Sequence, residues 1–152
     1  MEHLNFCVFG DSVGKGVVLS ETGRYTSGAP DINLLTGRSD ITLENFSRFG
    51  FVAEKTLSLV EKCESDIASS DAVFIEVGGN DCDFDWQAVS DHPEEKHLPK
   101  IAAETFVDNY RALVKLLRQA GSSVWMTSLV PLEAHRFLDH VSQGRSKENI
   151  LS

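Results

Sequence analysis

A short, nearly continuous apolar run from Ala72 to Val77 most constrains what this chain can fold into. Asp71 precedes the run and Gly78 follows it. A run of this length without polar alternation suits a β-strand buried on both faces. We therefore expect a sheet covered by other elements, not an open antiparallel surface.

Strand and helix patterns alternate along the rest of the chain. Further strands are predicted at Asn5–Phe9, Ile41–Phe46 and Ser123–Leu129, and amphipathic helices at Phe51–Ile67 and about Lys100–Ala120. Short β-α links of this kind predict an α/β domain with a parallel sheet covered by helices on both sides. We expect one domain over residues 1–152. No convincing periodicity is found in Ser20–Ser39, Asp81–Leu98 or Leu132–Gly144.

Composition narrows the function classes. The 152 residues carry a net charge of −9, which disfavours nucleic acid and anionic membranes as partners because both attract clustered Lys and Arg. The first residues have no basic region, and the apolar run after them is too short for a signal peptide. The cysteines Cys7, Cys63 and Cys82 are odd in number and lack CxxC spacing, which favours reduced thiols and a cytoplasmic location.

Polar and glycine residues gather where the predicted strands end. Gly10-Asp11-Ser12 follows the first strand, Phe49-Gly50 the second, and Gly78-Gly79-Asn80-Asp81 the third. In open α/β sheets, ligands bind at the carboxyl ends of the strands. These three segments are therefore the candidate site.

Acyl transfer is the chemistry that these residue types suit. It needs a nucleophile, donors for the developing oxyanion and a base. Ser12 can present its hydroxyl and its backbone N–H together. Gly50, without a side chain, allows a second N–H close to a carbonyl, and Asn80 offers a neutral amide donor.

The chain resembles the SGNH hydrolases, also called the GDSL esterase and lipase family, over essentially its whole length. Gly10-Asp11-Ser12 matches the first block with Val13 in place of leucine, Asn45 to Gly50 resembles the second, and Gly78 to Asp81 the third. The resemblance implies a flavodoxin-like three-layer α/β/α fold. It also implies Ser12 as catalytic nucleophile and an oxyanion hole made by the N–H groups of Ser12 and Gly50 and the side chain of Asn80.

The last block of that family, an Asp-x-x-His that supplies the base, is absent. Asp91-His92 and Asp139-His140 have the wrong spacing. Ser146 begins a helix pattern just before the sequence stops, which is typical either of a frayed tail or of a truncated domain that lacks its last strand and helix. We favour truncation, and expect little activity from this chain unless another chain supplies the base. Of the histidines present, His135 is the best placed to stand in.

Other interpretations stay open at this stage. Gly10 to Gly16 resembles a phosphate-binding P-loop, but it is one residue short and has Gly16 in place of Ser or Thr. The Asp81-x-Asp83-x-Asp85 pattern opens like a calcium loop but lacks its later residues.

The residues just after Asn80 have both functional and structural interpretations. Phe84 and Trp86 either line a pocket or pack within the loop. Cys82 is a structural or incidental residue, because nothing basic adjoins it to lower its pKa.

The favoured prediction is a serine esterase that acts on small acyl esters, such as acetyl groups on sugars, with no cofactor and no metal. A catalytically inactive remnant or binding module of the same fold is the main alternative. The predicted partners are a small ester substrate and a second copy of the chain that covers the incomplete sheet edge, with neither nucleic acid nor membrane involved. Whether the gene continues to an Asp-x-x-His would distinguish the esterase from the inactive remnant.

Overall fold

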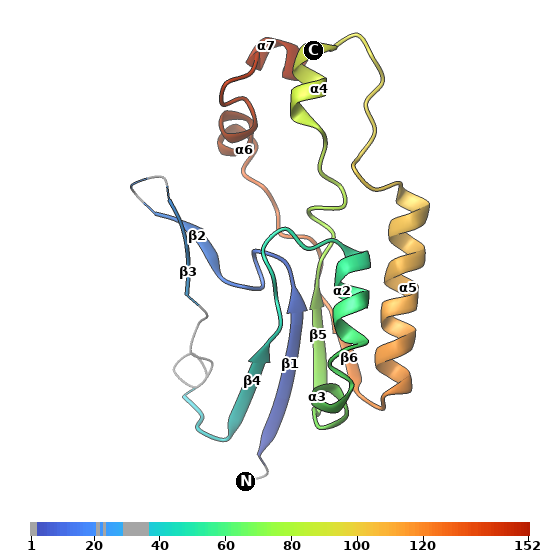
Figure 1. Cartoon of the computed structure of the whole chain (residues 1–152). Coiled ribbons are helices and arrows are strands. Elements are labelled where there is room, and N and C mark those ends of the chain that lie inside the picture. The colour runs from blue at the N-terminus through green and yellow to red at the C-terminus, as the bar shows by residue number, and fades with distance from the viewer. Residues whose placement is uncertain (1–2, 21, 23, 29–36) are drawn as a thin grey trace.

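A parallel four-stranded sheet forms the centre of the molecule (Figure 1). The computed structural model describes residues 3–20, 22, 24–28 and 37–152. The strand order is β4-β1-β5-β6, and all neighbours in this sheet run parallel. The strands are β1 (Leu4–Gly10), β4 (Ile41–Asn45), β5 (Ala72–Glu76) and β6 (Ser123–Met126). The predicted α/β class and the parallel sheet are confirmed.

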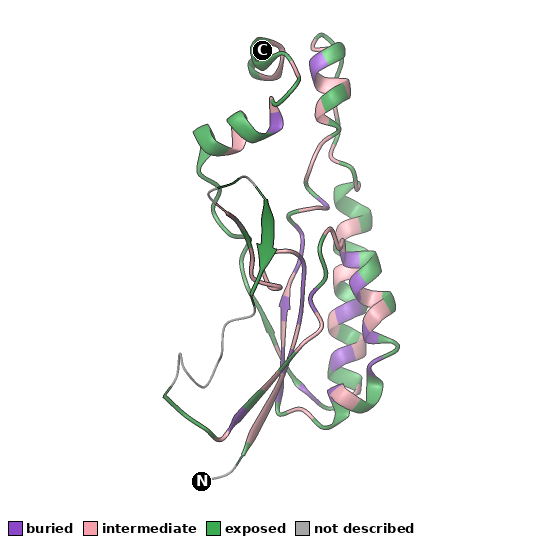
Figure 2. Ribbon diagram, turned by 60° about the vertical axis from the view of Figure 1, so that its left-hand side comes forward, coloured by how far each residue is buried: buried purple, intermediate pink, exposed green. Residues whose placement is uncertain are grey.

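Helices α2 (Ala53–Val60), α3 (Glu64–Ala68) and α5 (Ala103–Gln119) lie together on one side of the sheet (Figures 1 and 2). Alternate residues of β1 and β5, such as Phe9 and Ile75, point to that side and are fully buried against Leu113 and Leu117 of α5. The described residues thus show the sheet and one of the two expected helical layers.

The opposite side of the sheet is also apolar. Phe6 and Phe74 pack edge to face at 5.8 Å between ring centroids, and Phe74 stacks with Trp125 at 6.5 Å. Trp125 is 61% exposed, although its place in an apolar run predicts a core residue. The prediction was wrong because β6 is the last strand of the described sheet, so Trp125 has neighbours on one side only.

Regular structure lies in or directly beside the three segments without clear periodicity. A hairpin of β2 (Val17–Leu19) and β3 (Tyr25–Ser27) follows the first strand, and α4 (Trp86–Asp91) and α6 (Ala134–Val141) lie beyond the carboxyl ends of the strands. Asp85 caps α4 and Glu133 caps α6 through their side chains. Residues 21, 23 and 29–36 of the predicted loop lie outside the described part.

The predicted helix from Phe51 to Ile67 is divided. Backbone turns at Glu61 and Lys62 end α2 and start α3 at a new angle, although the apolar spacing continues. The predicted start of a helix at Ser146 is confirmed. The Ser146 hydroxyl accepts a hydrogen bond from Asn149 N at the head of α7 (Lys147–Leu151), which packs against α4.

Among the described residues, no helix is long and apolar enough to cross a membrane.

Candidate active site

Ser12 lies in a tight turn directly after β1, at the carboxyl end of the sheet. Two carboxylates hold the turn: Asp11 Oδ1 accepts a hydrogen bond from Val13 N at 2.9 Å, and Glu76 Oε2 accepts one from Gly14 N at 3.0 Å. Val17 N donates to the carbonyl of Ser12 at 2.9 Å. These bonds fix the turn, and Ser12 itself is half-buried.

The segment after β4 is bound to this turn. Arg48 N donates to the carbonyl of Gly10 at 3.0 Å, and Asn45 Nδ2 donates to the carbonyl of Gly14 at 2.8 Å. Gly50 ends the segment with φ +70°, and a Cβ there would meet nothing within 4 Å. Its glycine is therefore required by the positive φ, not by lack of room.

Asn80 joins the three segments. Its Nδ2 donates to the carbonyl of Phe51 at 2.9 Å and to Asp11 Oδ2 at 3.2 Å. Phe51 follows Gly50, and Asp11 precedes Ser12, so one amide group contacts the immediate neighbours of both other predicted site residues. The structure thus brings Ser12, Gly50 and Asn80 into one region at the ends of three parallel strands.

Two backbone donors in this region are free. No described residue accepts a hydrogen bond from the N–H of Ser12 or from the N–H of Gly50. Backbone N–H groups away from partners are costly unless water or a ligand satisfies them. Both groups are therefore available to an oxygen atom entering the site.

Three buried or half-buried carboxyl groups surround the turn. Burial, and then the neighbouring charge of Asp11, raise the pKa of Glu76. Burial also raises the pKa of Asp81, which is 1% exposed and accepts hydrogen bonds from Ala53 N at the head of α2 with both oxygens, each at 3.1 Å. Burial therefore shifts Glu76 and Asp81 toward their protonated, uncharged forms.

Glu76 is the site residue that the sequence analysis missed. Its signal was a single charged side chain inside the apolar run Ala72–Val77, which a purely structural strand would not carry. A second unexpected feature lies beside it. Ser47 Oγ is buried and has no hydrogen-bond partner among the described residues. It would lie only 2.9 Å from a Cβ on Gly10 and 2.7 Å from a Cβ on Gly14.

The histidines have other neighbours. His3 contacts Thr42 Oγ1 at 2.7 Å at the amino end of the sheet, His97 contacts the carbonyl of His92 at 2.8 Å, and His140 lies 3.5 Å from the Tyr25 hydroxyl. His135 is exposed on α6. Within the described part of the chain, no imidazole forms a hydrogen bond with Ser12.

The P-loop interpretation fits this geometry poorly. A phosphate site needs several backbone N–H groups directed at the anion. Here the N–H groups of Val13 and Gly14 already donate to carboxylates, and Lys15 N donates to the carbonyl of Asp11. The carboxyl groups of Asp11 and Glu76 thus occupy donors that a phosphate would need.

The acidic residues after Asn80 diverge instead of forming a calcium loop. Asp81 binds α2, Asp85 caps α4, and Asp83 contacts Lys100 Nζ at 2.6 Å and Trp86 Nε1 at 2.7 Å. Lys100 and Trp86 lower the pKa of Asp83 against the effect of its burial.

The aromatic residues of the same loop pack together. The Trp86 ring lies 5.6 Å from Phe84 and 5.8 Å from Phe137. Among described residues this matches the loop-packing alternative for Phe84 and Trp86. Cys82 is exposed.

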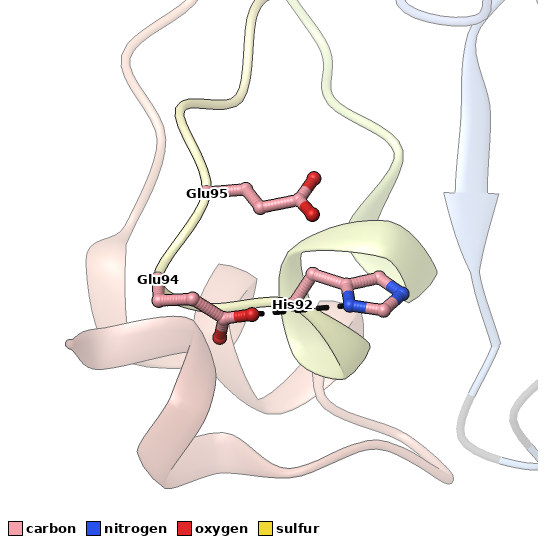
Figure 3. Close-up of side chains that lie close together, drawn as sticks. All are labelled: His92, Glu94 and Glu95. Atoms are coloured by element: carbon pink, nitrogen blue, oxygen red, sulfur yellow. Dashed lines mark ion pairs between the residues drawn. The ribbon is translucent and has the colours of Figure 1, made fainter.

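A second acidic group lies at the far end of α4. His92, Glu94 and Glu95 bring their ligand atoms within 4.8 Å of one another, and all three are exposed (Figure 3). His92 Nδ1 is 4.0 Å from Glu94 Oε1. Exposed groups of this type are usually solvated ion pairs and do not define a metal site.

Comparison with known proteins places the fold. No protein-family model and no curated protein matches the chain. Solved structures do match. The lipase/acylhydrolase from Enterococcus faecalis has a TM-score of 0.61 and 18% identity, over 97% of this chain and 66% of that one. TesA has a TM-score of 0.56 and 16% identity, over 92% of this chain and 73% of that one.

A GDSL-like lipase from Parabacteroides merdae gives a similar result, with a TM-score of 0.57, 18% identity, and coverage of 82% of this chain and 59% of that one. The chain thus spans about two thirds of the first of these structures and less of the third. Identities this low show the fold alone, and that fold is the one predicted from the three sequence blocks.

Proposed function

Because the chain has the fold of the SGNH hydrolases, we propose that its site hydrolyses carboxylic esters through an acyl-enzyme on Ser12. The observation that carries this proposal is the position of Asn80, whose side chain contacts the neighbours of both Ser12 and Gly50. The hydrogen bonds of Asn80 to Asp11 and Phe51, which are the chain neighbours of Ser12 and Gly50, support this proposal.

In the proposed reaction, Ser12 Oγ attacks the ester carbonyl while a base removes its proton. The carbonyl oxygen becomes an oxyanion and accepts hydrogen bonds from Ser12 N and Gly50 N. Asn80 Nδ2 gives up its longer hydrogen bond to Asp11 Oδ2, at 3.2 Å, and donates to the same oxyanion. The alcohol leaves with a proton, and water then hydrolyses the acyl-serine. Each donor in such a hole contributes about 10²–10³ in rate.

The base is the missing part of the proposal. The sequence has no Asp-x-x-His, and no described imidazole contacts Ser12. Loss of a triad histidine lowers kcat by several orders of magnitude, while an oxyanion hole alone retains about 10³–10⁴ over water. We therefore expect slow turnover of small acyl esters by this chain.

The test supplies a base from outside. Hydrolysis of p-nitrophenyl acetate is followed with increasing imidazole, for the wild type and for Ser12→Ala. The expected result is a rate that rises with imidazole above the level of Ser12→Ala. A Cys82→Ser variant is the matched control, because the exposed Cys82 thiol can take an acetyl group by itself. Its rate is expected to equal that of the wild type.

The inactive-remnant alternative is favoured by the same missing base. It expects equal rates for the wild type and Ser12→Ala at every imidazole concentration. That result would refute the esterase proposal, and loss of the rate in Cys82→Ser would assign the chemistry to the thiol. Asn80→Ala separates the two further, since the esterase proposal expects it to lower the imidazole-dependent rate about 10²-fold or more.

A further inference from the structure

The side-chain carboxyl groups of Asp11 and Glu76 are joined by a hydrogen bond beside the Ser12 turn. The two residues come from neighbouring parallel strands. Glu76 lies opposite Gly10 in the register of β1 and β5, and its backbone carbonyl accepts a hydrogen bond from Asp11 N at 3.1 Å. Asp11 is 4% exposed and Glu76 is half-buried. An ionised carboxyl group can only accept hydrogen bonds, so a bond between the two side chains requires one of them to hold a proton.

The other hydrogen bonds of the pair indicate which group holds this proton. Both oxygens of Asp11 accept from other residues: Oδ1 from Val13 N at 2.9 Å and Oδ2 from Asn80 Nδ2 at 3.2 Å. Glu76 Oε2 accepts from Gly14 N at 3.0 Å. Donors of this kind stabilise the charged form of a carboxyl group, which favours Asp11 as the charged member. Burial, and then the charge of Asp11, raise the pKa of Glu76 against the effect of its backbone donors, in agreement with this assignment.

We infer that uncharged Glu76 is a positioning residue for the oxyanion hole, an inference that rests on the proposed function. In the resting site, Asn80 Nδ2 donates to Asp11 Oδ2. When Asn80 turns to the oxyanion, Asp11 loses that donor, and the hydroxyl of the Glu76 carboxyl group continues to stabilise its charge. No proton leaves the pair in this step. Glu76 thus acts on the oxyanion through Asp11 and Asn80 and does not touch the substrate.

Ionised Glu76 would oppose the reaction in two ways. Asp11 would lose the hydrogen bond from Glu76 and would therefore keep its bond from Asn80. A second negative charge would also lie near the developing oxyanion, in a partly buried region where charges are weakly screened. The oxyanion hole is therefore expected to work while Glu76 is uncharged and to weaken as pH rises through its raised pKa.

Two other titratable groups act on the pair. Burial, and then the charge of Glu76, raise the pKa of Tyr110 on α5, so its hydroxyl stays uncharged where carboxyl groups titrate. Burial raises the pKa of Asp81, and the charge of Asp11 adds to this shift. Asp81 is therefore the second carboxyl group that would titrate above its ordinary range near the site, and Asp81→Asn is the matched control.

The first measurement is independent of activity. The side-chain carboxyl ¹³C signal of Glu76 is followed against pH in a chain labelled at its glutamates, and is assigned by its loss in Glu76→Gln. It is expected to titrate above the ordinary glutamate range. Asp11→Asn is expected to lower the pKa of Glu76, because the amide removes the neighbouring charge. An ordinary titration of Glu76, or one that a folded Asp11→Asn leaves in place, would overturn the proton-sharing pair.

The second measurement is the pH profile of imidazole-dependent hydrolysis of p-nitrophenyl acetate and does not need Asp11→Asn. The rate of Ser12→Ala is subtracted, and the result is divided by the concentration of uncharged imidazole. The wild-type rate is expected to fall at least about tenfold as Glu76 ionises, because one oxyanion donor is weakened. Glu76→Gln is expected to remove this fall, since its amide can donate to Asp11 and still accept from Gly14 N. Asp81→Asn is expected to retain the fall.

The outcomes separate this inference from the proposed function. A Ser12-dependent rate whose fall persists in Glu76→Gln, or disappears in Asp81→Asn, would refute the positioning role and leave the esterase proposal standing. The absence of any Ser12-dependent rate at every pH would refute the esterase proposal and the positioning role together. The titration of Glu76 would then still decide whether the two carboxyl groups share a proton.

Discussion

Gly78 provides a sharp test of how the Asn80 segment is built. It has φ +133°, a region that residues with a Cβ avoid. A Cβ at this position would lie 3.0 Å from Leu129 Cδ2 and 3.2 Å from Phe106 Cζ. Gly78→Ala should therefore destabilise the fold both by backbone strain and by overpacking.

Two costs add in Gly78→Ala. Backbone strain in such a region costs about 1–3 kcal/mol. Overpacking costs about 1–3 kcal/mol, but Leu129 is 48% exposed and can move aside, so its share is at the low end. We expect Gly78→Ala to lower the free energy of unfolding by about 3 kcal/mol and Tm by about 6–12 °C.

Gly79→Ala is the matched control. A Cβ on Gly79 would be 3.6 Å from Asp11 Oδ2, an ordinary contact, and its φ is not in the forbidden range. We expect a change within about 0.5 kcal/mol. Urea unfolding followed by far-UV circular dichroism gives both values. Equal losses for the two variants, or none for Gly78→Ala, would refute the described path of the chain after β5.

Three further predictions concern the polar groups around the site. Asp81→Ala should lower the free energy of unfolding by about 2 kcal/mol, because it leaves the N–H of Ala53 buried without an acceptor. Asp81→Asn should lower it less, because asparagine keeps one of the two oxygens. Equal losses for the two variants in urea unfolding would contradict this prediction. The raised pKa of Glu76 means that the folded state holds a proton on this group more tightly than the unfolded state does. The stability that Glu76 contributes is therefore full below the ordinary glutamate range. It is lost as pH rises through the raised pKa. Thermal unfolding from acid to neutral pH should therefore show Glu76→Gln gaining Tm relative to the wild type as pH rises, and a constant difference would count against it. Ser47→Ala should be neutral or stabilising, because the buried hydroxyl has no described partner, and a clear loss of Tm would reveal one.

The strands were predictable because a buried strand is made almost entirely of apolar residues. Ala72–Val77 reads as a buried strand, and β5 spans Ala72–Glu76. The site segments were predictable for a related reason: Ser12, Gly50 and Asn80 each follow a strand, and parallel strands bring their carboxyl ends to one edge. The predicted parallel sheet thus brought three segments that are distant in sequence to one edge.

The features that sequence reasoning missed depend on contacts between distant residues. Glu76 interacts with the Ser12 turn through Gly14 N, 62 positions away in the chain. The short helices α4 and α6 are set by caps and by packing between Trp86 and Phe137, not by a long periodic pattern. Trp125 has a core-like sequence context, but its position at a sheet edge depends on how many strands follow.

The most direct test of the central claim is to trap the nucleophile. The chain is incubated with a p-nitrophenyl phosphonate ester and imidazole, and the modified residue is identified by mass spectrometry of its peptides. The account predicts one phosphonyl group on Ser12, lost in Ser12→Ala and reduced in Asn80→Ala. Modification of Cys82 or of surface residues with Ser12 unmodified would contradict the proposal that these three strand ends form an esterase site.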